Sequence, residues 1–367
     1  MVKIAYLIND LDAGGAEVFL ERLLGRFDKE KFDSIVISIL PLGIVGQRMA
    51  GNNIKIVCLS KDRTPGIIGM AFALSKVLRQ EKPDILNCSL FHSIILGRAV
   101  GRICGVKKIV SVFHSDDLGS FFRKFFLMAT DIFSDRDIAV SQKIAQRLAK
   151  NNLAKPRKIE IINLGVNAAD QKNIRSRENI RRSFDTSDKD IVITALGRLH
   201  EAKGYFVLID AAKILVSKYS DLKFWIIGEG GLRRELEVKI KKFGLENKIR
   251  LLGFEPRPND HLNASDIYVL PSLWEGFPNS LIEAMACGLP PVAAKVSGAI
   301  EIIKDGQNGF LSEVNDPASL ADKLEKLILM SREERKKIGL LARKTVEENY
   351  SIEKMIGEYE KLYNKIL

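Results

Sequence analysis

Short runs of apolar residues alternate along the sequence with longer segments of helical periodicity. The runs are continuous, whereas a strand with one face in solvent would alternate apolar and polar residues. Continuous runs are typical of parallel strands buried on both faces, with helices covering the sheet. The sequence therefore predicts an α/β protein, with ligands bound at the carboxyl ends of the strands. The expected strands are 3–8, 34–40, 54–59, 85–89, 108–113, 159–162, 191–196, 223–227, 249–252 and 267–270.

The length and composition fit two soluble domains. A chain of 367 residues with 46% hydrophobic content is large enough for two cores. No apolar run approaches the roughly 18 residues needed to span a bilayer, and the first apolar run is too short for a signal peptide. The four cysteines are scattered without a C-x-x-C pair, so neither a zinc site nor a disulfide framework is indicated. We expect a cytoplasmic protein.

The positive charge is concentrated in the first half of the chain. Residues 1–168 contain 25 Lys and Arg against 16 Asp and Glu, whereas residues 169–367 contain 32 against 30. This asymmetry predicts an anionic partner for the first half. No nucleic-acid-binding motif is present, so we expect no nucleic acid among the partners.

The stretch 275–290 follows an apolar strand and predicts a turn and then a helix. Asn279 and Ser280 are good N-cap types, and the first N–H groups of such a helix can hold a phosphate. Glu275 and Glu283 would bracket a site for an anionic group and hydroxyls. A plain helix start that favours Glu residues is the alternative. Apolar residues in the turn, among them Phe277, argue against it.

Three further loops follow expected strands. The loop 197–204 carries Arg198 and Lys203 between glycines, and these two cations are suited to phosphate. The loop 14–17 contains two glycines before a helix, which on its own is weak evidence, and it lacks the G-x-G-x-x-G pattern of nicotinamide binding. His114 directly follows the strand 108–113. A lone His is more often structural, but this position favours a role in a site.

Taken together, these motifs resemble those of the family 4 retaining glycosyltransferases. The pair Glu275 and Glu283 matches the E-x7-E region of that family, and the loop 14–17 matches its G-G-x-E loop. The resemblance implies the GT-B fold, an α/β fold of two facing Rossmann-like domains with parallel sheets. The first domain would be 1–168, joined by a C-terminal helix at 351–367 that crosses back to it, and the second would be 169–350.

The resemblance also implies roles for individual residues. Those at the leaving group and the transferred sugar would be His114, Arg198, Lys203 and Glu275. Those around the donor would be Gly15, Gly228, Glu229, Phe254, Phe277, Asn279, Ser280, Leu281 and Glu283. Glu275 would bind sugar hydroxyls and Glu283 the ribose, while Glu17 would face the acceptor.

Metal ions are not expected in this site. The sequence spells D-x-D at 10–12 and at 135–137, which is the metal-nucleotide motif of the other glycosyltransferase fold. Two letters recur by chance in acidic loops, and Arg198 and Lys203 can replace a metal at the diphosphate. We therefore expect neither a metal nor another cofactor, the nucleotide-sugar being a substrate.

The function predicted from these features is retaining transfer of a hexose-type sugar from a nucleoside diphosphate sugar, with UDP as the expected nucleotide. The acceptor would be a hydroxyl of a saccharide, expected to be lipid-linked, in polysaccharide or glycan synthesis. Three alternatives remain: a nucleotide-sugar epimerase of similar fold, a glycoside hydrolase, and a noncatalytic nucleotide-sugar binding protein. The Glu275 and Glu283 pattern argues against the epimerase, and a hydrolase would not need Arg198 and Lys203.

One segment of the first half suggests contact with an anionic membrane surface. Residues 121–128 place four Phe, one Leu and one Met around Arg123 and Lys124. Aromatic residues and cations of this kind can bind a membrane interface, which would place the protein on the inner face of the cytoplasmic membrane. The alternative is an ordinary helix whose aromatics pack on the sheet.

Overall fold

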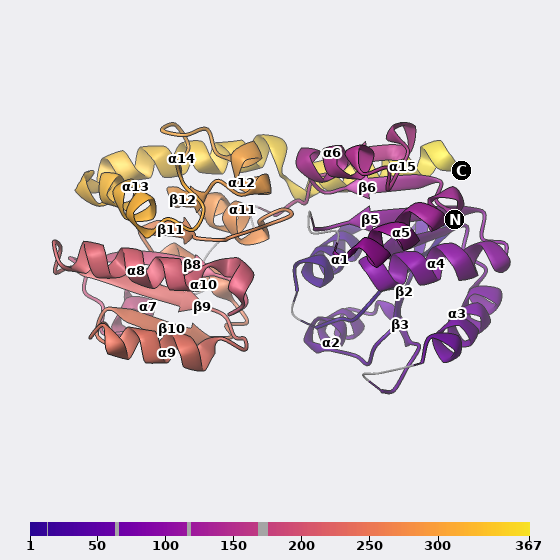
Figure 1. Cartoon of the computed structure of the whole chain (residues 1–367), viewed down its shortest axis with the longest axis horizontal. Coiled ribbons are helices and arrows are strands. Elements are labelled where there is room, and N and C mark those ends of the chain that lie inside the picture. The colour runs from indigo at the N-terminus through magenta and orange to yellow at the C-terminus, as the bar shows by residue number, and fades with distance from the viewer. Residues whose placement is uncertain (13, 63–65, 116–118, 168–174) are drawn as a thin grey trace. The chain divides into compact units, whose positions relative to one another are not determined.

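The computed structural model describes residues 1–12, 14–62, 66–115, 119–167 and 175–367. The chain divides into two compact units (Figure 1). The first unit contains Met1–Gly165 and Ile352–Leu367, and the second contains Val166–Ser351. The segment 168–170 of the expected domain boundary lies outside the described residues.

The first unit is built on a parallel sheet with the strand order β3-β2-β1-β4-β5-β6-β7. Its strands are β1 Val2–Ile8, β2 Phe32–Ser38, β3 Lys55–Cys58, β4 Ile85–Ser89, β5 Lys108–Phe113, β6 Arg136–Ala139 and β7 Ile159–Ile161. Its helices are α1 Gly15–Arg26, α2 Ile44–Gly51, α3 Ile67–Glu81, α4 Phe91–Ile103, α5 Phe121–Thr130, α6 Gln142–Lys150 and α15 Ile352–Ile366, with the 3-10 turns η1 Asp131–Phe133 and η2 Pro156–Lys158. The order reverses between β1 and β4, which is the switch point where such sheets bind ligands.

The strand β6 was not expected from the sequence. Its first half is charged, and Asp137 is completely buried there. Arg98 on α4 is equally buried, and its guanidinium donates a hydrogen bond of 2.7 Å to Asp137. Because a buried carboxylate needs such a partner, the strand depends on a residue far away in the sequence.

The last helix, α15, belongs to the first unit, as the resemblance implied for a C-terminal helix. Tyr359 and Tyr363 are fully buried, and Tyr363 accepts a hydrogen bond of 2.7 Å from Asn87 of β4. The ring of Tyr359 lies 5.8 Å from that of Phe19 on α1. The apolar stripe expected in this segment is therefore the surface that packs on the first sheet.

The second unit has its own parallel sheet, with the order β10-β9-β8-β11-β12-β13. Its strands are β8 Ile191–Leu196, β9 Leu222–Ile227, β10 Ile249–Gly253, β11 Ile267–Leu270, β12 Pro291–Ala294 and β13 Phe310–Ser312. Its helices are α7 Arg177–Ser183, α8 Tyr205–Val216, α9 Arg233–Lys242, α10 Pro258–Ala264, α11 Asn279–Ala286, α12 Ser297–Ile302, α13 Pro317–Leu329 and α14 Arg332–Asn349, with the 3-10 turn η4 Glu201–Lys203.

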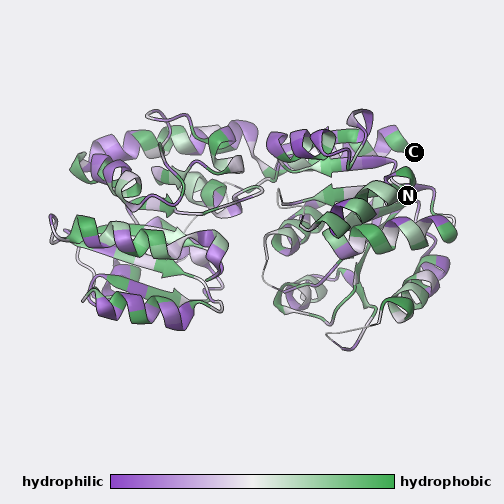
Figure 2. Cartoon of the chain, in the orientation of Figure 1, coloured by the Kyte–Doolittle hydropathy of each residue, from purple (hydrophilic) through white to green (hydrophobic). Residues whose placement is uncertain are grey.

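Hydropathy follows the layers of this unit. The strands and α8 are mainly hydrophobic, and α9 is mainly hydrophilic (Figure 2). The core contains β8, β9 and β11 with α8 and α13 against them. Within the described residues of both units, no helix is both long and apolar enough to cross a bilayer.

Candidate active site

The candidate site of the second unit is formed by the loops that follow β8, β9, β10 and β11. Backbone hydrogen bonds join these loops: Gly197 N–H donates to Ile227 at 3.0 Å, and Gly228 N–H donates to Gly253 at 2.8 Å. On the other side, Leu273 N–H donates to Ala202 at 2.8 Å. The loops predicted from the sequence therefore lie together at the carboxyl ends of the strands, and backbone hydrogen bonds hold them against one another.

Two glycines permit this close approach. Gly204 has a φ of 63°, and a Cβ there would lie 2.0 Å from the carbonyl oxygen of Pro271. Gly228 has a φ of 139°, and a Cβ would lie 2.0 Å from the carbonyl oxygen of Gly197. No other residue type fits these positions without moving a neighbouring loop.

Lys203 and Glu275 are in direct contact. The Lys203 Nζ lies 2.5 Å from the Glu275 Oε1, and the Ser272 hydroxyl donates to the same oxygen at 2.8 Å. Their side chains are 24% and 10% exposed, so the pair is partly shielded from water. Arg198 is exposed in the same loop, and within the described residues its guanidinium makes no hydrogen bond or ion pair. One cation of the predicted pair is thus already held, and the other is available.

The helix α11 begins one residue differently from the sequence prediction. Pro278 occupies the N-cap position, so Asn279 and Ser280 are the first residues of the helix and not its caps. The Ser280 hydroxyl accepts a hydrogen bond of 2.8 Å from Tyr268. The first turn still directs its backbone N–H groups out of the helix end, where an anion can bind.

Packing behind this turn fixes its shape. A Cβ on Gly298 of α12 would lie 2.4 Å from Pro278 and 3.0 Å from the Cα of Phe277. The Phe277 ring is buried and lies 5.7 Å from the ring of Tyr350. The Phe277 side chain therefore supports the turn, and its backbone is what it can present to a donor. Leu281 is likewise buried.

Glu283 is the fifth residue of α11. Its side chain is 8% exposed, so it is a largely buried carboxylate. On the opposite side of β8, Glu229 is bound by Arg233 at 2.7 Å, and Phe254 is 44% exposed after β10. These positions place an acidic side chain and an exposed ring beside the loop that carries Arg198.

In the first unit, the predicted residues Gly15 and Glu17 form the start of α1. Gly15 is exposed at the first helical position, while Glu17 is only 6% exposed. The Glu17 carboxylate folds back over Gly14, where a Cβ would lie 2.1 Å from its Oε2. A side chain at Gly14 would therefore displace Glu17.

His114 follows β5, as predicted, and its ring lies 5.4 Å from that of Phe19 on α1. Both ring nitrogens are buried, and neither has a hydrogen-bond partner among the described residues. Burial lowers the pKa of His114 to about 4. The imidazole is therefore neutral at neutral pH, with one donor and one acceptor nitrogen for a polar ligand.

His92 stands in an apolar run of helical periodicity, which predicts a core or packing residue, and this prediction is wrong. His92 is exposed at the start of α4, and its Nδ1 lies 3.3 Å from the Asn9 Nδ2 at the end of β1. Asn9 also accepts hydrogen bonds from the backbone and the hydroxyl of Ser93, at 3.0 and 2.7 Å. Leu90, just before α4, has a φ of 74°, which is unfavourable for a branched residue and typical of a functional loop. His92 and Ser93 come shortly after the carboxyl end of β4, and this position in the sequence could have predicted them as candidate site residues.

Acidic residues of the two D-x-D sequences have other partners. Asp135 binds Arg102 at 2.5 Å, and Asp137 binds Arg98. The Asp10 carboxylate accepts a hydrogen bond of 3.1 Å from the backbone N–H of Asp12. No cluster of three or more His, Cys, Asp or Glu residues that could hold a metal occurs within the described ranges.

Comparisons with known proteins give consistent matches to both units. Residues 176–345 match the family described as glycosyl transferases group 1, and residues 13–170 match the one described as glycosyltransferase family 4. UDP-Gal:alpha-D-GlcNAc-diphosphoundecaprenol alpha-1,3-galactosyltransferase of Escherichia coli is 30% identical over 283 residues, which cover 72% of this chain and 73% of that protein.

Two further matches are a synthase that is named for a different acceptor and a solved structure. N-acetyl-alpha-D-glucosaminyl L-malate synthase of Bacillus anthracis is 27% identical over 315 residues, covering 83% of this chain and 80% of that protein. The crystal structure of HepE from Anabaena, in complex with UDP and glucose, matches with a TM-score of 0.90 at 21% identity, covering 100% of both chains. The structural match shows a shared fold.

Proposed function

Because the chain belongs to the group 1 glycosyltransferases, we propose that it transfers a hexose-type sugar from a nucleoside diphosphate sugar to a saccharide hydroxyl with retention of configuration. UDP is the proposed nucleotide. The names of the galactosyltransferase relative and of the HepE complex, which mention UDP-Gal and UDP with glucose, support this choice.

The observation that carries the proposal is the contact of Lys203 with Glu275 in the loop that also holds Arg198, whose guanidinium has no partner among the residues that the structure describes. Cleavage of the sugar–phosphate bond leaves negative charge on the departing diphosphate. Arg198, Lys203 and the first N–H groups of α11 are the groups of the second unit suited to stabilise that charge. Glu275, held by Lys203 and Ser272, is suited to accept hydrogen bonds from the hydroxyls of the transferred sugar.

In the proposed reaction the acceptor oxygen attacks the anomeric carbon from the side on which the diphosphate leaves. The bond from the anomeric carbon to the phosphate oxygen breaks, the bond to the acceptor oxygen forms, and the acceptor proton moves to the departing phosphate oxygen. His114, Gly15 and Glu17 would be the contribution of the first unit. No metal is needed in this scheme, because the two cations and the helix end supply the positive charge.

We propose a lipid-linked saccharide as the acceptor and the cytoplasmic side of the membrane as the place of reaction. The E. coli relative is named for a diphosphoundecaprenol-linked acceptor, whereas the B. anthracis relative is named for L-malate. The choice between a lipid-linked and a soluble acceptor therefore needs a property of this chain itself. The exposed aromatic side chains of α5, among them Phe121 and Phe122, favour the lipid.

The proposal is tested by incubating the protein with a panel of nucleotide-sugars and lipid-linked saccharides in the presence of EDTA. We expect nucleoside diphosphate to be released only when the acceptor is present. We also expect NMR to show the same anomeric configuration, axial or equatorial, in the product as in the donor. Inversion of the linkage, sugar epimerisation without acceptor, or rescue of an EDTA-inactivated protein by Mn²⁺ would each contradict it. Glu283→Gln should weaken nucleotide binding, since this residue is assigned to the ribose.

A further inference from the structure

The helix α5 exposes nearly all of its large hydrophobic side chains. Phe121 and Phe122 are 79% and 73% exposed, Phe125 and Phe126 are each 50% exposed, and Leu127 is the one buried residue of the helix. A helix that covers a sheet in the ordinary way would bury such aromatics. The alternative in which these rings pack on the sheet is therefore wrong.

A second helix has the same character. On α3, Ile67, Ile68 and Phe72 are between 73% and 76% exposed. The helix α4 contacts both α3 and α5, and it exposes Ile103 at its end. The three helices, each of which contains many hydrophobic residues (Figure 2), form one surface that we call the helical face. The sequence alone indicated only the part of this face that belongs to α5.

The charge on the helical face is almost entirely positive. All residues of the three helices are described, and Glu81 is their single acidic residue. Glu81 is buried and bound by Lys3 and Lys55, each at 2.8 Å. The cations of the face are Lys76, Arg79, Arg102, Arg123 and Lys124, besides the buried Arg98. A second copy of the chain would bring these cations against one another, whereas an anionic lipid surface matches both the rings and the charge.

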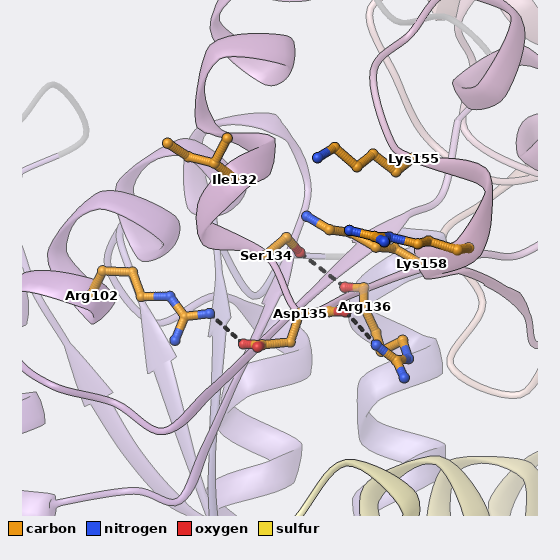
Figure 3. A pocket seen from close by; sticks show the side chains of 8 residues that line it. Arg102, Ile132, Ser134, Asp135, Arg136, Lys155 and Lys158 are labelled. Carbon is orange, nitrogen blue, oxygen red and sulfur yellow. Dashed lines mark hydrogen bonds and ion pairs between the residues drawn. The ribbon is translucent and has the colours of Figure 1, made fainter.

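A basic groove adjoins the end of the helical face (Figure 3). It has a volume of about 480 Å³ and is lined by Arg102, Ile132, Ser134, Asp135, Arg136, Lys155, Arg157 and Lys158. The turn η1 follows α5 directly and contacts α4, so Ile132, which is 69% exposed, continues the apolar surface into the groove. The groove lies where β6 and β7 begin, whereas His114 follows the other end of the neighbouring strand β5.

Two of the cations in the groove are available for a ligand. Arg102 is bound to Asp135, and Lys158 donates to the carbonyl oxygen of Asp131 at 2.6 Å. Lys155 and Arg157 are exposed, and their side chains have no hydrogen bond or ion pair within the described part of the chain. Lys155 and Lys158 extend from one short turn into the groove (Figure 3). Such a set of cations is suited to a phosphate group.

We propose that the helical face binds the surface of an anionic membrane and that the groove binds the phosphate of a phospholipid head group. The aromatics of α5 and the apolar residues of α3 enter the interface, and Lys155 and Arg157 fix the position of the unit on it. This inference rests on the proposed function only in that a lipid-linked acceptor gives the membrane contact its purpose.

The test is flotation of the full-length protein with vesicles of phosphatidylcholine alone or mixed with phosphatidylglycerol. Wild type is expected to bind the anionic vesicles at low salt and the neutral ones weakly. Ile67→Ser/Phe72→Ser should weaken binding by at least about tenfold, since two exposed apolar side chains are lost. Lys155→Glu/Arg157→Glu should weaken binding to anionic vesicles by about 30-fold or more, because the loss of each cation reduces the affinity by about fivefold and the two factors multiply.

Matched controls come from exposed positions on α14 in the second unit. Leu340→Ser/Leu341→Ser and Lys336→Glu/Lys337→Glu make the same chemical changes and should leave vesicle binding within about twofold of wild type. All four variants should retain the unfolding midpoint of wild type. Loss of binding in the controls as well, or no association of wild type with anionic vesicles, would overturn the proposal.

Calorimetric titration with inorganic phosphate distinguishes the source of the phosphate group. If Lys155→Glu/Arg157→Glu abolishes the binding of free phosphate but leaves vesicle binding unchanged, the groove is a site for a soluble anion and the lipid assignment is wrong. Failure of the proposed glycosyl transfer would leave the vesicle results as they stand, so the two proposals are tested separately. Transfer to a water-soluble acceptor should be unchanged in the groove and α3 variants.

Discussion

Lys203 Nζ and Glu275 Oε1 lie 2.5 Å apart, although 72 residues separate them in the sequence. The contact means that the carboxylate assigned to the sugar partly neutralises the cation assigned to the diphosphate. A donor that binds here would draw Lys203 toward its phosphates and leave Glu275 to the sugar hydroxyls. The pair therefore couples the two ends of the bond that breaks.

This coupling predicts the behaviour of Glu275→Gln. The variant should bind the nucleoside diphosphate at least as tightly as wild type, because Lys203 is no longer offset by a negative charge. Transfer should fall by about 100-fold, since a neutral amide is a weaker hydrogen-bond acceptor for the sugar. Calorimetry of diphosphate binding and initial rates of transfer measure the two effects.

The matched control is Glu237→Gln, which also removes a carboxylate near a cation, in this case 3.0 Å from Arg233 on α9. The affinity for the nucleoside diphosphate and the rate of transfer should both remain near wild type in that variant. Weaker diphosphate binding by Glu275→Gln would show that this carboxylate serves the nucleotide and not the sugar.

Arg198→Ala should lower the rate of transfer by about two orders of magnitude, because it removes a free cation from the departing diphosphate. The guanidinium has no partner among the described residues, so its loss should leave the midpoint of thermal unfolding nearly unchanged. Arg234→Ala, at an exposed position of α9, provides the control. A near-normal rate in folded Arg198→Ala would place the phosphate site elsewhere.

The sequence predicted the fold in most of its parts because the strands are buried on both faces. The expected strands 85–89, 108–113, 191–196 and 267–270 have the bounds that the structure shows. The GT-B fold implied by the resemblance is confirmed by the two parallel sheets and by the likeness to HepE. Local apolar pattern is sufficient where burial alone decides the structure.

The sequence did not predict features that depend on distant partners. The strand β6 carries two charged residues, and its buried Asp137 is tolerated only because Arg98 reaches it from α4. The helix α11 begins after Pro278, which lies close to Gly298 of α12, so the N-cap preference of Asn279 and Ser280 did not decide its start. The contact between Lys203 and Glu275 joins two distant segments. The exposure of Ile67, Ile68 and Phe72 on α3 likewise depends on what packs against the helix and not on its own sequence.

The role of Gly204 can be separated from its backbone conformation. Gly204 and Gly244 have φ values of 63° and 66°, so an alanine at either position costs roughly 1 kcal/mol for the left-handed region. At Gly244 the added Cβ meets nothing within 4 Å, whereas at Gly204 it would lie 2.0 Å from the Pro271 oxygen. Gly204→Ala should therefore lose clearly more stability than Gly244→Ala in urea unfolding, and it should also lose transfer activity. Equal losses of stability would mean that the two loops do not approach each other so closely.

The pKa of His114 predicts a pH dependence of stability. Burial lowers this pKa to about 4, whereas a histidine in an unfolded chain titrates near about 6.5. Between these values the unfolded state binds a proton that the folded state does not, so a fall in pH favours unfolding. The stability contributed by the neutral, buried ring is fully present above about pH 6.5 and decreases by about 3 kcal/mol as the pH approaches about 4.

His114→Gln removes this titration and thereby isolates it from the carboxylates that also titrate in this range. The free energy of unfolding of wild type, measured in urea, should fall relative to that of the variant by about 3 kcal/mol between about pH 7 and about pH 4. If the curves of wild type and His114→Gln are parallel, the ring takes up a proton in the folded state. Burial would then not hold the ring neutral below about pH 6.5, which would contradict the lowered pKa of His114.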